Sequence, residues 1–124
     1  ILNEHQLLPI LEKHGFSVIH PGRLSLEEQM AAFAEAKIIV APHGAELANL
    51  VYCQPNTRIV EIFSPYYLNP CFRELAALAG LRHTAVVGQG GSRILRQRKD
   101  AHFVWANIRV PTDDFSKHLE TVLD

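Results

Sequence analysis

Residues 37–63 constrain the fold of this chain more than any other stretch. Two short β-branched runs, residues 38–40 and 59–62, have the composition of strands that are buried on both faces. Between them, residues 45–52 form an apolar helical segment with almost no polar face, so we expect this helix to be covered on most sides. The stretch therefore predicts a βαβ unit.

Helical and strand patterns alternate through the rest of the chain. Asn3 can cap a first helix that ends near His14, and Ser25 with Glu28 forms a capping box for the helix before residue 37. Further helices are predicted for residues 72–79 and 112–123, and further strands for residues 16–20, 83–87 and 102–110. This order predicts a single domain over residues 1–124, an α/β fold of Rossmann-like type: a three-layer αβα sandwich with a mostly parallel sheet.

Three residues at the break after the first βαβ strand have the chemistry of a ligand site. His43, Gly44 and Ala45 precede the helix, and a helix N-terminus at the carboxyl end of a parallel strand favours anion binding. His43 can donate a hydrogen bond to a phosphate oxygen or a proton to a leaving group, and Gly44 allows close approach to the backbone. Glu61, near the end of the next strand, could accept hydrogen bonds from a ribose. Together they predict a nucleotide pocket.

The same residues also have structural interpretations that the sequence leaves open. A histidine before a helix is often a cap or turn residue, and Gly44 can be an ordinary turn glycine. Glu61 can be a solvent-facing strand residue that pairs with Arg58 or Lys37.

The loop after this strand and the stretch near residue 90 are also ambiguous. Ser64 could add a hydroxyl to the site, while Tyr66 and Tyr67 either contact a ligand or are ordinary loop residues. Residues 88–92 are glycine-rich but lack dinucleotide and P-loop spacing, so we expect a flexible loop. The basic residues within 93–99 either attract a phosphate-bearing substrate or an anionic lipid surface, or lie in solvent.

Composition excludes several classes of protein. A formal net charge of −1 argues against a nucleic-acid-binding protein. Cys53 and Cys71 have no CxxC spacing and are expected to be free buried thiols, and the seven histidines lack paired ligand spacing, so we expect no metal and no cofactor. No signal-like or transmembrane stretch is evident, which favours a cytoplasmic location, or the lumen of the secretory pathway if the source is eukaryotic.

An ordered set of short motifs runs through the first half of the chain. Its members are Gly15-Phe16, Leu24-Ser25 with Glu28-Gln29, Ala36-Lys37, Pro42-His43-Gly44-Ala45, Asn49 and Ile59-Val60-Glu61-Ile62. This set resembles the C-terminal half of the family 61 glycosyltransferases, also called the DUF563 family. The resemblance implies a two-lobed GT-B architecture, sugar transfer from a nucleotide donor and no essential metal. The chain would then be the donor-binding lobe.

The resemblance also implies roles for individual residues. Residues 43–45 would hold the diphosphate, with His43 stabilising the leaving group, Asn49 would support that loop or touch the donor, and Glu61 would hold the ribose. Glu46 departs from the small residue expected there, and a carboxylate at that position repels a diphosphate unless it points away.

The remaining expectations concern partners. A missing N-terminal lobe would bind the glycan or polysaccharide acceptor, the isolated domain would be inactive, and its exposed lobe surface could form a homodimer. The alternative function is a non-catalytic nucleotide-binding or interaction module that retains only the fold.

Overall fold

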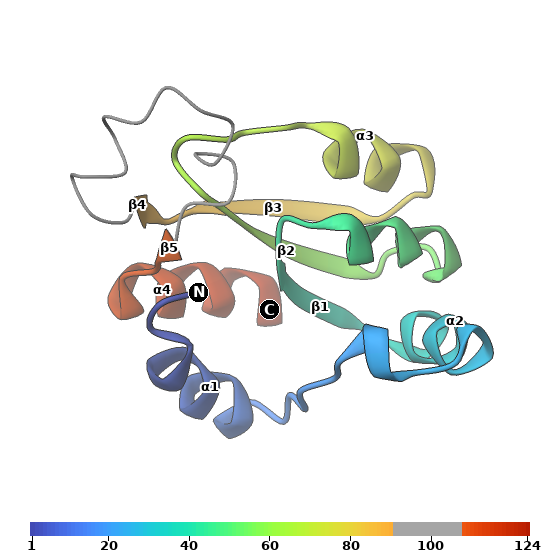
Figure 1. Ribbon diagram of the computed structural model, residues 1–124, viewed down its shortest axis with the longest axis horizontal. Helices are drawn as coiled ribbons and strands as arrows, with labels where there is room; N and C mark the ends of the chain where they lie inside the picture. The colour runs from blue at the N-terminus through green and yellow to red at the C-terminus, as the bar shows by residue number, and fades with distance from the viewer. Residues whose placement is uncertain (91–107) are drawn as a thin grey trace. The chain divides into compact units, whose positions relative to one another are not determined.

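The computed structural model describes residues 1–90 and 108–124 (Figure 1). The described elements are, in chain order, α1 (Glu4–Lys13), η1 (Pro21–Arg23), α2 (Leu26–Glu35), β1 (Ile38–Pro42), η2 (Ala45–Tyr52), β2 (Arg58–Phe63), α3 (Cys71–Leu78), β3 (Arg82–Val87), β4 (Gln89–Gly90), β5 (Ile108–Arg109) and α4 (Thr112–Leu123). Strands β1, β2 and β3 form a parallel sheet in that order, and β4 pairs with β5 antiparallel, with Gln89 opposite Arg109. This α/β structure is consistent with the predicted Rossmann-like fold.

The described chain divides into two compact units. The first unit comprises Ile1–Ser17, Ile62–Leu68 and the described part of Ala85–Asp124. The second unit comprises Val18–Glu61 and Asn69–Thr84. The second unit therefore contains the whole βαβ crossover from β1 through η2 to Glu61, together with the start of β3.

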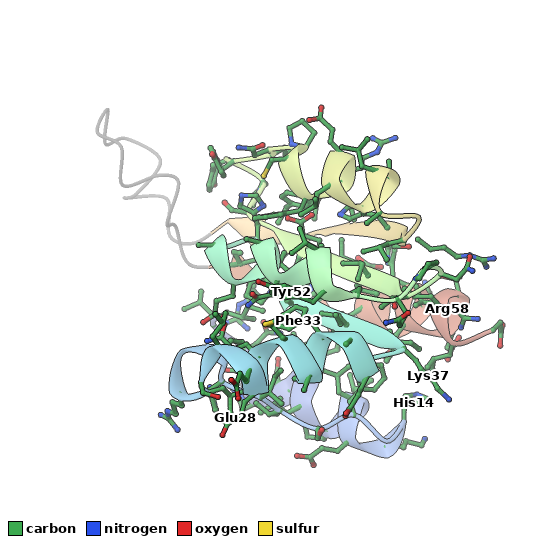
Figure 2. The ribbon with its side chains drawn as sticks, turned by 90° about the vertical axis from the view of Figure 1, so that its right-hand side faces the viewer. His14, Glu28, Phe33, Lys37, Tyr52 and Arg58 are labelled. Atoms are coloured by element: carbon green, nitrogen blue, oxygen red, sulfur yellow. The ribbon has the colours of Figure 1, made fainter. Side chains whose placement is uncertain are left out.

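Three helices in the second unit pack around a common core. The capping box at the start of α2 is confirmed, because Ser25 Oγ accepts from Glu28 N and Glu28 Oε2 accepts from Ser25 N, both at 3.1 Å. Helix η2 lies between α2 and α3, with Phe33 of α2 at its interface with η2 (Figures 1 and 2). The buried core cluster consists of Phe33, Leu47, Leu50, Ile59, Ala76 and Leu81. This core fixes η2, and with it the break that follows β1.

In the first unit, α1 lies beside α4 (Figure 1), and Asn3 connects the N-terminus to the residue after β5. Asn3 Nδ2 donates to Val110 O at 2.7 Å, and its Oδ1 accepts from Val110 N at 2.9 Å. Asn3 does occupy the N-cap position of α1, but its side chain makes no capping bond. The predicted capping role was therefore wrong, because the amide satisfies the backbone of Val110 instead. Helix α4 has the bounds of the predicted helix 112–123 and buries Phe115, Leu119 and Val122.

Other predictions differ from the structure in places. Residues 16–20 were expected to form a strand, but no strand is assigned there, and Val18 and Ile19 are 51% and 47% exposed. An apolar run becomes a strand only when a neighbouring strand supplies hydrogen bonds, and none does so in the described chain. Segment 45–52 is helical but of the 3₁₀ type, and Val51 is exposed, so the helix is less covered than expected.

The glycine-rich stretch and the last predicted strand are described only in part. Gln89–Gly90 form β4 rather than a loop, and Ile108–Arg109 form β5. Residues 91–107 lie outside the described part of the chain, and with them the basic run and most of predicted strand 102–110.

Candidate functional site

The candidate site begins where β1 ends. His43 follows the last residue of β1, Gly44 is the N-cap of η2, and Ala45 is its first residue. Gly44 has φ 178° and ψ 167°, an extended conformation that any residue can adopt. A Cβ atom at Gly44 would have one neighbour within 4 Å, Pro42 O at 3.9 Å. Neither the backbone nor local packing therefore requires glycine here, and the space beside this backbone is open.

Glu61 of β2 lies between two histidines. Its Oε1 is 2.5 Å from His43 Nδ1, and its Oε2 is 2.6 Å from His83 Nε2. The side chain of Glu61 is 0% exposed, whereas those of His43 and His83 are 16% and 8% exposed. We call these three residues the His–Glu–His cluster. A buried carboxylate is costly unless its oxygens are satisfied, and here each oxygen has an imidazole partner.

The fold brings the three residues together from neighbouring strands. His43 comes from the end of β1, Glu61 from β2 and His83 from β3, in the order in which these strands pair. A hydrogen bond of 2.9 Å from Arg82 N to Thr57 O helps to hold β3 beside β2. The parallel sheet thus carries the cluster across separations of 18 and 22 residues along the chain.

An aromatic contact further restricts the His43 ring. Phe72 of α3 lies with its ring centroid 5.2 Å from that of His43, and the two ring planes are inclined by 52°. Tilted ring pairs at this separation are favourable. His43 is therefore held by Glu61 on one atom and by Phe72 on its ring.

The ionisation of Glu61 determines which ring nitrogens of the two histidines carry a hydrogen. An ionised carboxylate can only accept hydrogen bonds, so with Glu61 ionised both His43 Nδ1 and His83 Nε2 carry a hydrogen. The interpretation of Glu61 as a solvent-facing residue paired with Arg58 or Lys37 was wrong, because its carboxylate is buried and bonded to histidines. A contact between Glu61 and a ribose stays a prediction, and it requires this side chain to become accessible.

Asn49 connects two helices of the second unit. Its Nδ2 donates to Gln29 Oε1 at 3.0 Å, and Gln29 Nε2 donates to Leu24 O at 3.2 Å. Asn49 therefore ties η2 to α2, which supports the helix that follows residues 43–45. Contact between Asn49 and a donor stays a prediction. Ala45 and Glu46, in the first turn of η2, are exposed.

Ser64 and Tyr66 belong to the first unit. Ser64 is buried, and its Oγ accepts a hydrogen bond from Tyr66 N at 3.2 Å. The ring of Tyr66 lies so close to Gly90 that a Cβ atom there would come within 2.2 Å of it. Ligand contacts by Ser64, Tyr66 and Tyr67 stay predictions.

The two cysteines differ from the expected pair of buried thiols. Cys71 is exposed, while Cys53 is partly buried, and this burial raises the pKa of the Cys53 thiol to about 11. Within residues 1–90 and 108–124, no group of three His, Cys, Asp or Glu side chains is arranged to hold a metal ion. In the same ranges, no helix combines the length and apolar character needed to cross a bilayer.

His83 is the cluster member that sequence reasoning missed. The pattern places it at the start of a predicted strand, with no neighbouring motif. The available signal was weak: an isolated histidine on the strand that follows the one carrying Glu61. Only the pairing of β2 with β3, which the sequence does not specify, brings His83 next to Glu61.

Comparison with known proteins adds independent information. A family model described as glycosyltransferase 61 matches residues 1–60. A beta-1,2-xylosyltransferase of Arabidopsis thaliana is 33% identical over 78 residues, covering 61% of this chain and 15% of that protein. The beta-1,2-xylosyltransferase RCN11 of Oryza sativa subsp. japonica is 33% identical over 63 residues, covering 51% of this chain and 12% of that protein.

A third relative has a different activity in its name. The EGF domain-specific O-linked N-acetylglucosamine transferase of Drosophila melanogaster is 31% identical over 86 residues, covering 67% of this chain and 16% of that protein. The matched segments thus span between 12% and 16% of these relatives. No solved structure gives a significant match. The family model covers the motif set as far as Val60, His43 included, and residues 1–60 of this chain belong to glycosyltransferase family 61.

Proposed function

We propose that this chain is the donor-binding lobe of a family 61 glycosyltransferase and that residues 43–45 hold the diphosphate of a nucleotide sugar. One observation carries the proposal: the His43 ring, at the end of a parallel strand and before a helix, is anchored by a fully buried Glu61. The carboxyl ends of parallel strands are where α/β folds bind nucleotides. A histidine held rigidly at that position is suited to an anionic ligand.

The backbone at the start of η2 supports the same role. In a 3₁₀ helix that begins at Ala45, the N–H groups of Ala45 and Glu46 have no partner within the helix. The next N–H, of Leu47, donates to Gly44 O at 3.0 Å. Two backbone donors and one histidine therefore lie within four consecutive residues, a suitable set for phosphate oxygens.

The chemistry of His43 follows from its bond to Glu61. Because Nδ1 is bonded to the carboxylate, His43 would contact a diphosphate through Nε2. In such a complex His43 would donate from both ring nitrogens, through Nδ1 to Glu61 and through Nε2 to phosphate, and a ring that donates from both nitrogens is cationic, so the second hydrogen bond would be charge-assisted. Negative charge develops on the diphosphate as the sugar leaves, so this contact would strengthen in the transition state.

The relatives suggest the class of reaction. Two of them are named xylosyltransferases and one an N-acetylglucosamine transferase, so we propose a nucleotide-linked xylose or N-acetylglucosamine as donor. The matched segments span at most 16% of those proteins. The acceptor site, for a glycan or a protein-linked sugar, and the catalytic base would then lie in a second lobe. This chain alone would bind donor without transferring sugar.

One observation favours the alternative, a non-catalytic module that keeps the fold. Glu46 is exposed in the first turn of η2, immediately after the proposed diphosphate loop. A carboxylate there would repel a diphosphate by like charge. In that case this chain would bind nucleotide sugars weakly or not at all, and the Glu46→Gly variant would restore binding.

The test is a calorimetric and NMR titration of this chain with UDP, GDP, UDP-xylose and UDP-N-acetylglucosamine. We expect saturable binding of either the uridine or the guanosine nucleotides, with the largest changes in NMR chemical shift at residues 43–46. His43→Ala should weaken that binding about tenfold or more, as expected for loss of one charge-assisted hydrogen bond. His20→Ala, an exposed histidine in the same unit, is the matched control and should bind like the original chain.

A second variant tests close approach to the backbone. Because Gly44 has open space and an extended backbone, Gly44→Ala should fold normally, so any loss of binding would come from the ligand meeting the new methyl group. The proposal is wrong if His43→Ala and His20→Ala bind equally well. It is also wrong if no nucleotide binds at millimolar concentration to either the original chain or the Glu46→Gly variant.

A further inference from the structure

We propose that His83 is a positioning residue that acts on His43 through Glu61. None of the comparisons or sequence motifs assigns His83 a role. Its Nε2 lies 2.6 Å from Glu61 Oε2, and its side chain is 8% exposed. The consequence for donor binding rests on the proposed function of His43, whereas the effect on the His43 ring itself does not.

The buried carboxylate of Glu61 depends on both of its hydrogen-bond partners. Glu61 has no exposed surface, so water cannot replace a lost partner in this structure. If the His83 donor were removed, Oε2 would be buried without its hydrogen bond, an unfavourable state for an ionised group. The carboxylate would then rotate or take up a proton. Each of these changes alters the bond that Oε1 makes with His43.

The hydrogen bond to Glu61 also sets the tautomer of His43. With both oxygens of Glu61 accepting, Nδ1 of His43 must carry the hydrogen, and the neutral ring then has its lone pair on Nε2. If Glu61 becomes protonated after loss of His83, it can donate to Nδ1 instead, and the hydrogen of the neutral ring moves to Nε2. His83 therefore decides whether Nε2 of His43 is an acceptor or a donor, although only His43 would meet the ligand.

The geometry suggests a matched pair of variants. His83→Gln can place an amide N–H near the position of Nε2 and keeps a donor for Glu61, whereas His83→Leu has similar bulk and no donor. The comparison separates the hydrogen bond from the filling of space. His83→Asn, whose amide is one bond shorter and cannot reach Oε2 in the same way, provides a third variant if His83→Leu does not fold.

The experiment is a long-range ¹H–¹⁵N NMR spectrum of the histidine-labelled chain, recorded where the imidazoles are neutral. Signals of His43 are assigned by their loss in His43→Ala. We expect the Nδ1–H tautomer in the original chain and in His83→Gln, and the Nε2–H tautomer or a mixture in His83→Leu or His83→Asn. His118 is an internal control, because its Nδ1 bonds to Asp114 O on α4, and its signals should not change.

A nucleotide titration of the same variants supplies the second readout. His83→Leu should bind donor about tenfold more weakly, because a Glu61 side chain that no longer accepts from Nδ1 cannot support a His43 ring that donates from both nitrogens. This is the low end of the effect of losing an outer hydrogen-bond partner at metal sites, and His83→Gln should recover the binding. The inference is overturned if His43 keeps the same tautomer in His83→Leu and His83→Asn. If the tautomer changes as expected but no nucleotide binds the original chain, His83 is a positioning residue and the proposed function is the part that fails.

Discussion

Replacing Glu61 by glutamine tests the energetic account of the His–Glu–His cluster. The two side chains have nearly the same size, so the substitution creates no cavity. Glutamine offers one oxygen acceptor and one N–H₂ donor in place of two acceptors. One histidine can therefore still donate a hydrogen bond to the glutamine oxygen. The other histidine must accept a hydrogen bond from the glutamine N–H₂ group through a ring nitrogen that carries no hydrogen. Both remaining hydrogen bonds are then between neutral groups.

The size of the effect follows from these two bonds. A hydrogen bond to a charged group contributes about 1.5–3 kcal/mol to stability, and a neutral one about 0.5–1.5 kcal/mol. Loss of roughly 1 kcal/mol at each of two bonds predicts that Glu61→Gln lowers the free energy of unfolding by about 2 kcal/mol. For a chain of this length, that corresponds to a fall in Tm of roughly 8 °C.

An opposing effect makes the result informative. A buried charge loses hydration on folding, and replacing a buried ion pair by neutral groups is sometimes neutral or stabilising. The net effect is measured by urea denaturation followed by circular dichroism, with Glu46→Gln as control, because Glu46 is exposed. The control should lie within about 0.5 kcal/mol of the original chain. If Glu61→Gln also lies within that range, the hydrogen bonds of the cluster do not outweigh the cost of burying its charge, and the predicted loss of about 2 kcal/mol is refuted.

Three further predictions concern other parts of the chain. Gly88→Ala should lower the free energy of unfolding by about 1–3 kcal/mol in urea denaturation, because a Cβ atom there would lie 2.3 Å from the Ile108 side chain; Gly22→Ala, with open space, is the control and should not. Ser25→Ala should remove the cap of α2 and cost about 1 kcal/mol in the same assay, and an unchanged midpoint would contradict the capping box. At pH 8, Cys71 should react with iodoacetamide well before Cys53, because the raised pKa of about 11 leaves the partly buried Cys53 thiol protonated; equal rates in mass spectrometry would refute this.

Elements with strong local signals were predictable from the sequence. Ser25 and Glu28 indicate the start of α2, and the β-branched runs indicate β1 and β2. Gly80, with φ of 72°, follows the C-cap residue of α3. The failures needed non-local information. Residues 16–20 have the composition of a strand, yet strand formation depends on a partner, which composition does not specify. Likewise, Asn3 has a side chain suited to capping a helix, but its amide forms hydrogen bonds with the backbone of Val110, 107 residues away in the sequence.

The candidate site shows the same division. His43 and Gly44 were predicted from the break between a strand and a helix, and Glu61 from the end of the following strand. What the sequence did not give was the partner of each group, because a carboxylate on a strand can bond to any neighbour that the sheet brings near. His43 and His83 are 18 and 22 residues from Glu61, so no local pattern connects them.

The exposed fractions of the cluster indicate how it would act on a ligand. Exposure decreases from 16% at His43 to 8% at His83 and 0% at Glu61, so His43 is the most accessible member. A ligand that reaches the end of β1 would therefore meet His43 first. Glu61 and His83 would act by holding the His43 ring and by determining which of its nitrogens carries a hydrogen. Such an arrangement orients the ring before the ligand arrives, so that binding need not supply the free energy of ordering it. The buried carboxylate is costly to fold in isolation, and its two imidazole partners are what make it compatible with a site of this kind.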